Sequence, residues 1–345
     1  MKKPKVSVQI LNYNGKRFLK DCFDSLLKQN YSNFEIILVD NGSKDGSIEW
    51  LKDNYKKEIK SKKIIILKFP KNLGVAKGNN IAYRFSKADY ALLLNSDTIL
   101  IYPNFLRSIV AFAQKGDYAI IKPVAYPFKT KKFPIVTKQG ALNVLGFPLY
   151  DVIKETDLFI TGEACMLVRK DKIDYLFLDK YFAYGEDVFL CWRSKIKGFR
   201  AAEDRKDFFL HYGQGSAVPR SAFIRFNTEK NRIVNLLIFY ETKTLFKIFP
   251  LLFFEHLIKV IYSLKYPKLF IAFYKAIFWD IKNIKFIIKQ RKKIQKERKL
   301  SDKEIIKTFS YKIFPEHISG VATFLNKLSK TYCQLLRIKT YELSN

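Results

Sequence analysis

Short apolar runs alternate with amphipathic segments over the first hundred residues, and this alternation predicts strands separated by helices. Val6–Leu11 is a run rich in β-branched residues, and Lys16–Gln29 carries apolar residues at helical spacing. The alternation continues with strands at Glu35–Val39, Ile64–Leu67 and Tyr90–Leu94, and with helices beginning near Asp45 and spanning Val75–Phe85. Strands joined through helices form right-handed βαβ units, so the expected class is α/β with a mostly parallel sheet flanked by helices.

Polar residues stand at the end of each of the four predicted strands. They are Asn12 and Asn14, Asp40 and Asn41, Asn72, and finally Asn95 and Asp97. Ligands of parallel α/β sheets bind at the carboxyl ends of the strands. One polar strand end predicts only a turn, but four at the same edge of a sheet predict a binding site.

The pattern loosens between Pro103 and Thr161 and then becomes regular again. The expected elements are a helix at Asn104–Lys115, a strand near Ala119–Lys122, a long irregular loop, a strand at Glu163–Val168, a helix at Asp187–Lys197, and a short strand at Asp207–Tyr212. This part therefore continues the α/β domain, whose expected extent is residues 1–232.

After about residue 230 the chain becomes rich in Phe, Ile and Leu, and residues 233–345 are expected to form a helical, basic C-terminal region. Ile233–Tyr262 and Leu269–Ile288 are apolar, but charged residues interrupt both stretches, whereas a spanning helix needs about 20 predominantly apolar residues. The basic run Lys289–Lys299 follows. Amphipathic aromatic helices followed by basic residues are typical of an interfacial membrane anchor. A helical hairpin packed on the first domain, with a solvated charged end, is the alternative.

The charge balance favours polyanionic partners. The 345 residues hold 63 Lys and Arg against 32 Asp and Glu, which gives a net charge of +31. Nucleic acid, anionic lipid and phosphorylated substrates all fit this excess. The four cysteines are far apart in sequence, which argues against a zinc site or a disulfide scaffold and fits a reducing cytosolic setting. The N-terminal apolar run is too short for a signal peptide and is expected to be the first strand.

Several carboxylates are candidates for chemistry. Asp97 ends a buried strand, where it can coordinate Mg²⁺ together with substrate phosphates or cap a turn. Asp40 precedes a flexible Asn-Gly-Ser-Lys-Asp-Gly segment and can accept hydrogen bonds from a ribose or a base. Glu186 and Asp187 follow Gly185 at the start of a predicted helix, where they serve the helix N-terminus, catalysis, or both. The dinucleotide and P-loop fingerprints are absent.

Seven segments in order make the chain similar to a known family. They read SVQILNYNG, ILVDNGSKDGS, NLGVAKGNN, YALLLNSDT, TGEACMLVRK, YFAYGEDVFLCWR and HYGQGS. Together they resemble the family 2 glycosyltransferases, which have a GT-A fold, and the closest match is to the rhamnosyltransferase-like branch. The resemblance covers roughly residues 5–235.

The resemblance implies a nucleotide-sugar site on the strand ends. Asn12 and Tyr13 would lie against the base and ribose, and Asp40 would bind the base. Asn72 and Lys77 would lie near the ribose and the diphosphate. These positions imply a UDP- or dTDP-sugar donor, dTDP-rhamnose among the candidates.

The resemblance also implies a metal site, a base and an acceptor site. Asp97 matches the last acid of the family's D-x-D motif, with Asn95 at the first position, and implies Mg²⁺ or Mn²⁺ bound with the donor. His211 matches a position that approaches the metal or diphosphate, or makes a structural hydrogen bond. Asp187 matches the catalytic base with Glu186 beside it. Acceptor binding is expected from Glu163 and Tyr184.

The implied activity is inverting transfer of a sugar to a hydroxyl of a lipid-linked glycan or cell-surface polysaccharide precursor. A carboxylate deprotonates the attacking hydroxyl, a general-base contribution of about 10²–10⁴-fold, and a divalent cation neutralises the leaving diphosphate. The expected location is the cytoplasm, peripheral on the inner face of the cell membrane, with the C-terminal region on the anionic lipid surface.

Two other functional classes compete with the enzyme. Asn95 and Phe189 stand where the family often has acids, which would suit an inactive homologue acting as a membrane scaffold. Asp40, Asp97 and Asp187 are nevertheless present, and they favour the enzyme. A basic nucleic-acid-binding protein would also explain the charge. No RRM, KH or helix-turn-helix signature occurs, so a nucleic-acid partner is not expected.

Overall fold

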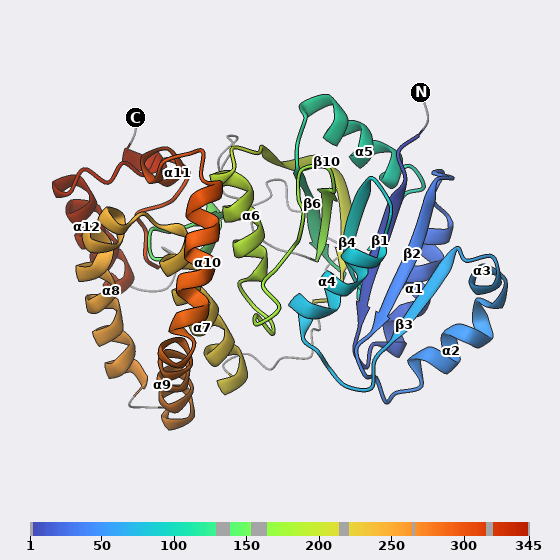
Figure 1. Cartoon of the computed structure of the whole chain (residues 1–345), viewed down its shortest axis with the longest axis horizontal. Coiled ribbons are helices and arrows are strands. Elements are labelled where there is room, and N and C mark those ends of the chain that lie inside the picture. The colour runs from blue at the N-terminus through green and yellow to red at the C-terminus, as the bar shows by residue number, and fades with distance from the viewer. Residues whose placement is uncertain are drawn as a thin grey trace. The chain divides into compact units, whose positions relative to one another are not determined.

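The computed structural model describes residues 3–128, 139–152, 164–213, 221–263, 266–314 and 320–343 (Figure 1). The chain forms two compact units. The first, here the sheet unit, comprises Met1–Ile135, Gly162–Ala183 and Arg200–Ser216. The second, here the helical unit, comprises Val136–Thr161, Tyr184–Phe199 and Ala217–Asn345.

The sheet unit is built on an eight-stranded sheet with strand order β3-β2-β1-β4-β9-β6-β10-β5. The strands are β1 (Val6–Asn12), β2 (Phe34–Asp40), β3 (Ile64–Lys68), β4 (Tyr90–Asn95), β5 (Thr98–Leu100), β6 (Ile120–Pro127), β9 (Cys165–Arg169) and β10 (Ala201–His211). Strands β3, β2, β1 and β4 are parallel, as the sequence predicts. Strand β9 is antiparallel to β4 and β6, and β5 is antiparallel to β10, so the sheet is mixed.

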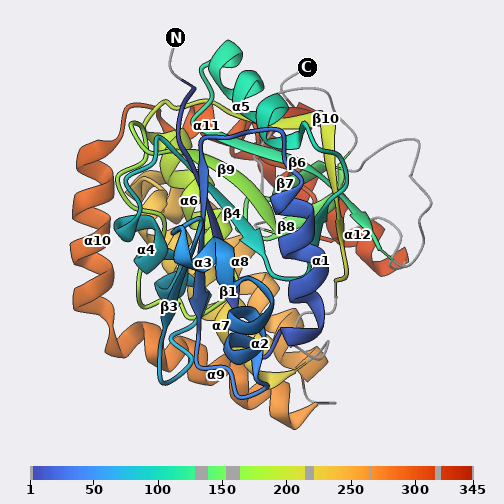
Figure 2. The same cartoon turned by 90° about the vertical axis from the view of Figure 1, so that its right-hand side faces the viewer.

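Helices cover both faces of the parallel half of the sheet (Figure 2). They are α1 (Lys16–Leu27), α2 (Ser47–Asn54), α3 (Lys56–Lys60) and α4 (Val75–Phe85). Helix α5 (Phe105–Gly116) instead packs on β6 and β10. Val8 and Ile10 of β1 share one apolar cluster with Phe23 of α1. Leu11 points to the other face and joins a second cluster with Ala82 of α4. Side chains alternate between the faces of a strand, and this alternation assigns α1 and α4 to opposite faces.

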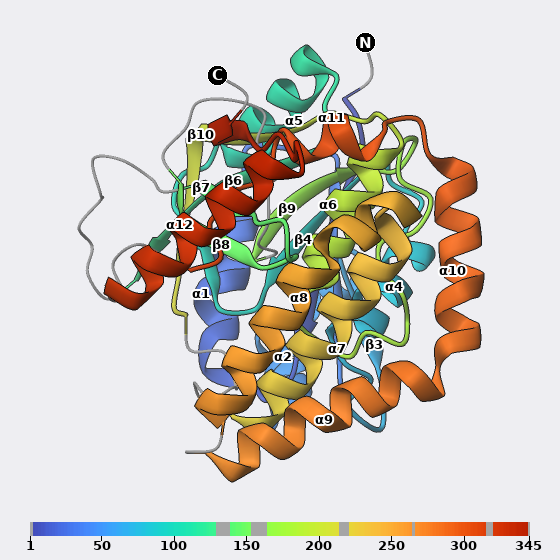
Figure 3. The same ribbon diagram turned by 90° about the vertical axis from the view of Figure 1, so that its left-hand side faces the viewer.

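The helical unit contains a two-stranded hairpin and seven α-helices in its described part (Figure 3). The elements are β7 (Gln139–Leu142), β8 (Pro148–Val152), α6 (Glu186–Ile196), α7 (Ala222–Phe239), α8 (Thr242–Ser263), α9 (Pro267–Lys282), α10 (Ile284–Glu297), α11 (Asp302–Ile306) and α12 (Gly320–Leu335). The hairpin lies in the stretch that the sequence analysis takes for an irregular loop. Each long C-terminal apolar stretch is divided between two helices, with breaks at Tyr240 and Asn283.

Aromatic packing builds α6 into the helical unit. Trp192 is fully buried, stacks on Phe239 with ring centroids 5.0 Å apart, and meets Tyr240 and Phe309 edge-on at 4.9 and 5.1 Å. Offset and edge-to-face aromatic pairs add about 0.5–1.5 kcal/mol each beyond their buried area. The predicted boundary after residue 232 lies inside α7. The division into a catalytic part and a membrane-associating part stays a prediction.

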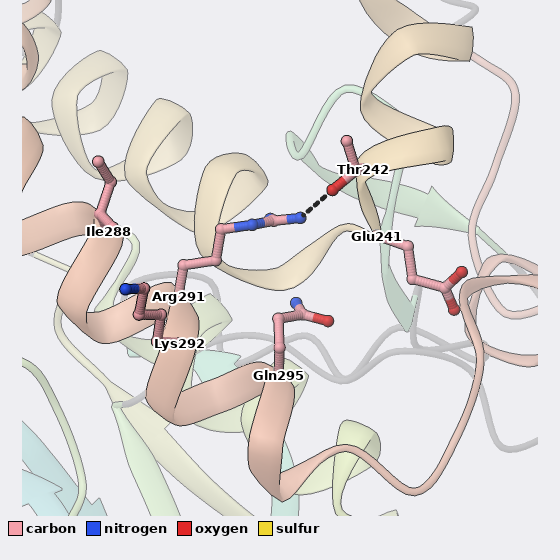
Figure 4. Close-up of a pocket in the computed structure, with 6 residues that line it drawn as sticks. All are labelled: Glu241, Thr242, Ile288, Arg291, Lys292 and Gln295. Atoms are coloured by element: carbon pink, nitrogen blue, oxygen red, sulfur yellow. Dashed lines mark hydrogen bonds between the residues drawn. The ribbon is translucent and has the colours of Figure 1, made fainter.

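The basic run Lys289–Lys299 is only partly a solvated charged end, because two of its arginines are structural. Arg291 donates to the carbonyl oxygen of Tyr240 at 2.6 Å. It also donates to the hydroxyl of Thr242 at 3.0 Å (Figure 4). Arg298 pairs with Asp302 at 3.1 Å. Gln295 donates to two further carbonyl oxygens at the end of α7. These side chains satisfy helix-end carbonyls that have no partner within the helix.

No helix in the described part of the chain is both long and apolar enough to cross a membrane.

Candidate active site

Parallel register gathers the polar strand ends of the sheet unit at one edge. Asn12 of β1 lies opposite Asp40 of β2, and Leu11 lies opposite Asn95 of β4. Neighbouring strands are about 4.8 Å apart, so the ends of β2 and β4 are separated by roughly 10 Å. A Cβ at Gly15 would approach both the Asn12 amide and the Ser96 hydroxyl, at 2.6 and 3.0 Å. The polar ends of β1, β2 and β4 therefore lie at one edge of the sheet, as the sequence predicts, and a binding site at this edge stays a prediction.

Asp40 is held by its neighbour and keeps one oxygen available. Asn12 donates from Nδ2 to Asp40 Oδ1 at 3.2 Å, and both side chains are fully buried. Asp40 Oδ2 has no hydrogen-bond partner among the described residues. A buried acceptor without a partner costs about 1–3 kcal/mol, so this oxygen is suited to the donor groups of a ligand. Tyr13 is 42% exposed beside this pair.

Two residues that the sequence analysis did not assign hold the loops around Asp40. Ser43 accepts from Asn12 Nδ2 at 3.1 Å and from the backbone of Asn14 at 2.9 Å. Asp45 accepts from the backbone of Lys16 at 2.8 Å. Hydrogen bonds from Ser47 and Lys16 overcome the effect of burial and hold the pKa of Asp45 below its usual value. The only sequence signal for Ser43 and Asp45 was their place in the segment that follows Asp40.

Asn72 is positioned by Asn41 rather than pointing freely into the site. Asn41 donates to Asn72 Oδ1 at 2.8 Å, and the same oxygen accepts from the backbone of Gly74 at 2.8 Å. Gly74 has φ 84°, and a Cβ there would lie 2.5 Å from the carbonyl oxygen of Phe182. The glycine is therefore required by close backbone approach. Lys77 lies exposed in the first turn of α4.

Asp97 and His211 meet across the antiparallel pair of β5 and β10. His211 Nε2 lies 3.2 Å from Asp97 Oδ1, and His211 stands opposite Thr98 in the register. No group of three or more acidic, His or Cys side chains in the described ranges could hold a metal alone. Mg²⁺ usually takes one or two carboxylates together with substrate phosphates. This pair therefore fits a cation that a bound diphosphate also ligates.

Glu186 and Asp187 form the first turn of α6 in the helical unit. The turn before them has left-handed backbone at Tyr184 (φ 65°) and Gly185 (φ 85°). Two asparagines of α7 hold it: Asn231 donates to the carbonyl oxygen of Tyr184 at 2.6 Å. Asn235 donates to that of Gly185 at 3.1 Å. The sequence analysis assigns neither asparagine to this turn, because nothing in the local pattern links α7 to it.

The other residues singled out from the sequence differ in their burial and in their contacts. Phe189, where the chain departs from the family's acid, is fully buried, with its ring 5.4 Å from that of Phe239. Tyr184 lies edge-on to Phe223 at 6.3 Å. Glu163 lies outside the described residues. Lys230, Asn231 and Arg232 on α7 are buried, and Arg232 is bound to Glu229 at 2.9 Å and Glu255 at 3.3 Å.

Comparison with known sequences identifies the family. The profile described as Glycosyl transferase family 2 matches residues 7–177. An uncharacterized glycosyltransferase of Haemophilus influenzae is 34% identical over 186 residues, which are 51% of this chain and 71% of that protein. The chain belongs to glycosyltransferase family 2. A second relative, the glycosyltransferase GlyG of Streptococcus pneumoniae, is 30% identical over 121 residues. These residues are 34% of this chain and 37% of GlyG.

Solved structures confirm the fold of this glycosyltransferase. GalNAc-T7 with UDP, GalNAc and Mn²⁺ matches with a TM-score of 0.55 and 13% identity, over 69% of this chain and 48% of that one. The mannosyltransferase PcManGT of Pyrobaculum calidifontis, with GDP-Man and Mn²⁺, matches with a TM-score of 0.50 and 14% identity, over 68% and 64%. At such identities the likeness supports the GT-A fold alone. The rhamnosyltransferase-like branch stays a prediction.

Asn231→Ala should lower the turnover of this glycosyltransferase about tenfold while leaving donor affinity unchanged, because the turn that carries Glu186 and Asp187 loses a hydrogen bond worth roughly 0.5–1.5 kcal/mol. Turnover and nucleotide affinity, measured separately, check this. Asn54→Ala is the matched control, since Asn54 also donates to a backbone carbonyl but lies exposed at the end of α2. Unchanged turnover of Asn231→Ala would show that the turn does not depend on this contact.

Proposed function

We propose that the protein transfers a sugar from a nucleoside diphosphate sugar to an acceptor hydroxyl with inversion at the anomeric carbon. The proposed binding of the sugar donor rests on the buried pair of Asp40 and Asn12. In this pair Asp40 Oδ2 has no hydrogen-bond partner among the described residues. A buried carboxylate oxygen at the carboxyl ends of parallel strands suits the donor groups of a base or ribose. UDP and GDP-Man in the two structural neighbours support a nucleotide-sugar donor.

Asp97 and His211 would hold a divalent cation on the donor diphosphate, supported by their 3.2 Å contact and by Mn²⁺ in both structural neighbours. The cation, Mg²⁺ or Mn²⁺, supplies positive charge to the leaving diphosphate. Lys77 adds a cationic side chain at the start of α4, where helix N–H groups favour phosphate.

Asp187 is the proposed general base, with Glu186 beside it in acceptor binding. The acceptor hydroxyl gives its proton to the Asp187 carboxylate as its oxygen attacks the anomeric carbon, and the bond to the diphosphate breaks in the same step. Support comes from the turn that two asparagines of α7 hold in place. Tyr184, whose carbonyl Asn231 holds, and Glu163 are the proposed acceptor contacts.

The acceptor is proposed to be a lipid-linked glycan or polysaccharide precursor, because the helical unit exposes an apolar and basic surface. Every third or fourth residue along α8 and α9 is an exposed large apolar side chain. We call this set the α8–α9 apolar face: Phe246, Phe249, Phe253, Leu257 and Ile261 with Ile271, Tyr274, Phe278 and Ile281.

Charge favours an anionic membrane as the partner of the α8–α9 apolar face. Lys268, Lys275 and Lys282 are exposed on α9. Helices α9 and α10 lie wholly within the described residues and carry the acids Asp280 and Glu297. Asp280 is buried, and Glu297 is paired with Arg193. An apolar stripe with lysines and no exposed acid is typical of interfacial helices. This supports a peripheral position on the inner, anionic face of the cell membrane.

A donor screen tests the activity. Incubation with UDP- and dTDP-sugars plus Mg²⁺ or Mn²⁺ should release nucleoside diphosphate, and chelation of the metal should stop the release. Asp40→Ala should weaken nucleotide affinity about tenfold, because the pair with Asn12 and the ligand contact are both lost. If no donor is bound or turned over, the protein is an inactive homologue instead.

Asp187→Asn should lower transfer by about 10²–10⁴-fold and leave donor affinity near that of the wild type, because an amide cannot accept the acceptor's proton. Glu186→Gln is the comparison within the same turn and should retain most of the turnover. Isothermal titration with the nucleotide and single-turnover transfer assays separate the two properties. Equal turnover of wild type and Asp187→Asn would assign the base to another residue.

The double variant Phe278→Ser, Ile281→Ser should weaken binding to phosphatidylglycerol vesicles by about tenfold or more, because each side chain is about two-thirds exposed and available for burial in the bilayer. Vesicle co-sedimentation measures this, and added salt should weaken wild-type binding too. The control is Phe324→Ser, Leu335→Ser on α12, which removes equally exposed apolar surface. An equal loss in both double variants would reject the α8–α9 apolar face as the membrane contact.

A further inference from the structure

An apolar pocket of about 260 Å³ lies within the helical unit between α7, α8 and α9. We call it the α7–α9 pocket. Its apolar lining includes Phe249, Leu252, Phe253, Phe273, Ala276 and Ile277. A cavity of about 150 Å³ with such a lining is enough to bind benzene, and sites for larger ligands begin near 300 Å³. The α7–α9 pocket therefore has room for a segment of a hydrocarbon chain.

The rim of the pocket belongs to the α8–α9 apolar face. Phe249 and Phe253 line the pocket and are also 63% and 56% exposed. They stand one turn apart on α8 and continue the same exposed stripe. The exposed stripe of α8 is therefore continuous with the lining of the pocket.

Most charged side chains that line the pocket are neutralised by ion pairs, with Lys259 as a further partner. Glu229 binds Arg232 at 2.9 Å and Lys259 at 2.5 Å, and Glu255 binds Arg232 at 3.3 Å. Although burial opposes its ionisation, the cations Arg232 and Lys259 hold the pKa of Glu229 at about 2. A buried charge is tolerated when it is paired and hydrogen-bonded, so these residues do not need a ligand.

Asp280 is the exception. It is 5% exposed and lines the pocket, yet neither of its carboxyl oxygens has a hydrogen-bond partner among the described residues. Burial raises the pKa of Asp280 to about 8, against the opposing effect of Lys230 and Arg232, so the carboxyl is mostly protonated at neutral pH. A protonated carboxyl both donates and accepts a hydrogen bond. His256 and the paired Glu229, Arg232 and Glu255 also line the pocket, but Asp280 is the lining carboxyl that has no partner among the described residues. It is therefore the polar contact that the pocket offers to a ligand.

We infer that the α7–α9 pocket binds a single-chain lipid, whose hydrocarbon chain packs on Phe249, Phe253 and Phe273 and whose oxygen-bearing end group hydrogen-bonds with Asp280. The chain chemistry is that of a fatty acid or a long-chain alcohol. The inference depends on the proposed membrane association in one respect only, namely that the membrane supplies this lipid. A lipid bound in the α7–α9 pocket would hold the α8–α9 apolar face at the bilayer.

The test uses the full chain in solution, without vesicles or sugar donor, and two fluorescent probes. One is cis-parinaric acid, a chain with a carboxyl end, and the other is diphenylhexatriene, a hydrocarbon without a polar group. The wild type should bind parinaric acid saturably at one site. Ala276→Leu places extra carbons in the pocket and should weaken binding of both probes about tenfold. Phe278→Ser, exposed on the same helix and outside the pocket lining, should bind both probes like the wild type.

Asp280 separates the polar contact from simple apolar binding. Asp280→Leu should weaken parinaric acid about three- to tenfold and leave diphenylhexatriene unaffected or tighter. Asp280→Asn keeps hydrogen-bonding capacity and should retain parinaric acid, which covers the case that Asp280→Leu does not fold. Circular dichroism and melting curves establish folding for each variant.

Three results would overturn the inference. They are no saturable binding by the wild type, wild-type affinity in Ala276→Leu, and equal effects of Asp280→Leu on the two probes. The first excludes the site, the second puts the probe on the exposed face, and the third removes the role of Asp280. None of these measurements depends on sugar transfer or vesicle binding, so they are independent of the outcome for the proposed function.

Discussion

Parallel pairing in register across β3, β2, β1 and β4 is the constraint on which the candidate donor site depends. It brings Asp40 opposite Asn12, so that an amide donor meets one carboxylate oxygen and the other oxygen stays available. A slip of one residue would turn every side chain of a strand to the opposite face. The apolar clusters on both faces of β1 prevent such a slip, because each alternate residue is already packed against a helix.

Helix α7 has a comparable role in the helical unit. Residues 229, 231, 232 and 235 recur at helical spacing, and all four are buried and polar. Asn231 and Asn235 face the turn before α6, whereas Glu229 and Arg232 face α8. A buried ion network of this kind adds little net stability relative to an apolar core, but it allows few alternative arrangements of the helices. The helix that carries the proposed base, Asp187, thus starts from a turn that a second helix, α7, holds in place.

The composition of the C-terminal region has two physical consequences. Part of the positive charge is used internally, since Arg291 and Arg298 bind carbonyl oxygens and a carboxylate. The exposed lysines of α9 and the aromatic residues of α8 remain on the surface. A net charge of +31 therefore does not by itself measure the charge available to a membrane. The proposed membrane contact and the proposed lipid pocket share one rim, formed by Phe249 and Phe253.

The sequence by itself determined the local elements of the first hundred residues and the polar strand ends, because apolar periodicity and strand-end polarity are local patterns. The helix at Val75–Phe85 agrees residue for residue, and the family motifs pointed to Asp40, Asp97 and His211. Only the tertiary structure decided contacts between distant segments: the antiparallel insertion of β9, the asparagines of α7 on the turn before α6, and the pairing of Arg232 with Glu255. These contacts join residues tens of positions apart, and no periodicity within one segment encodes its partner.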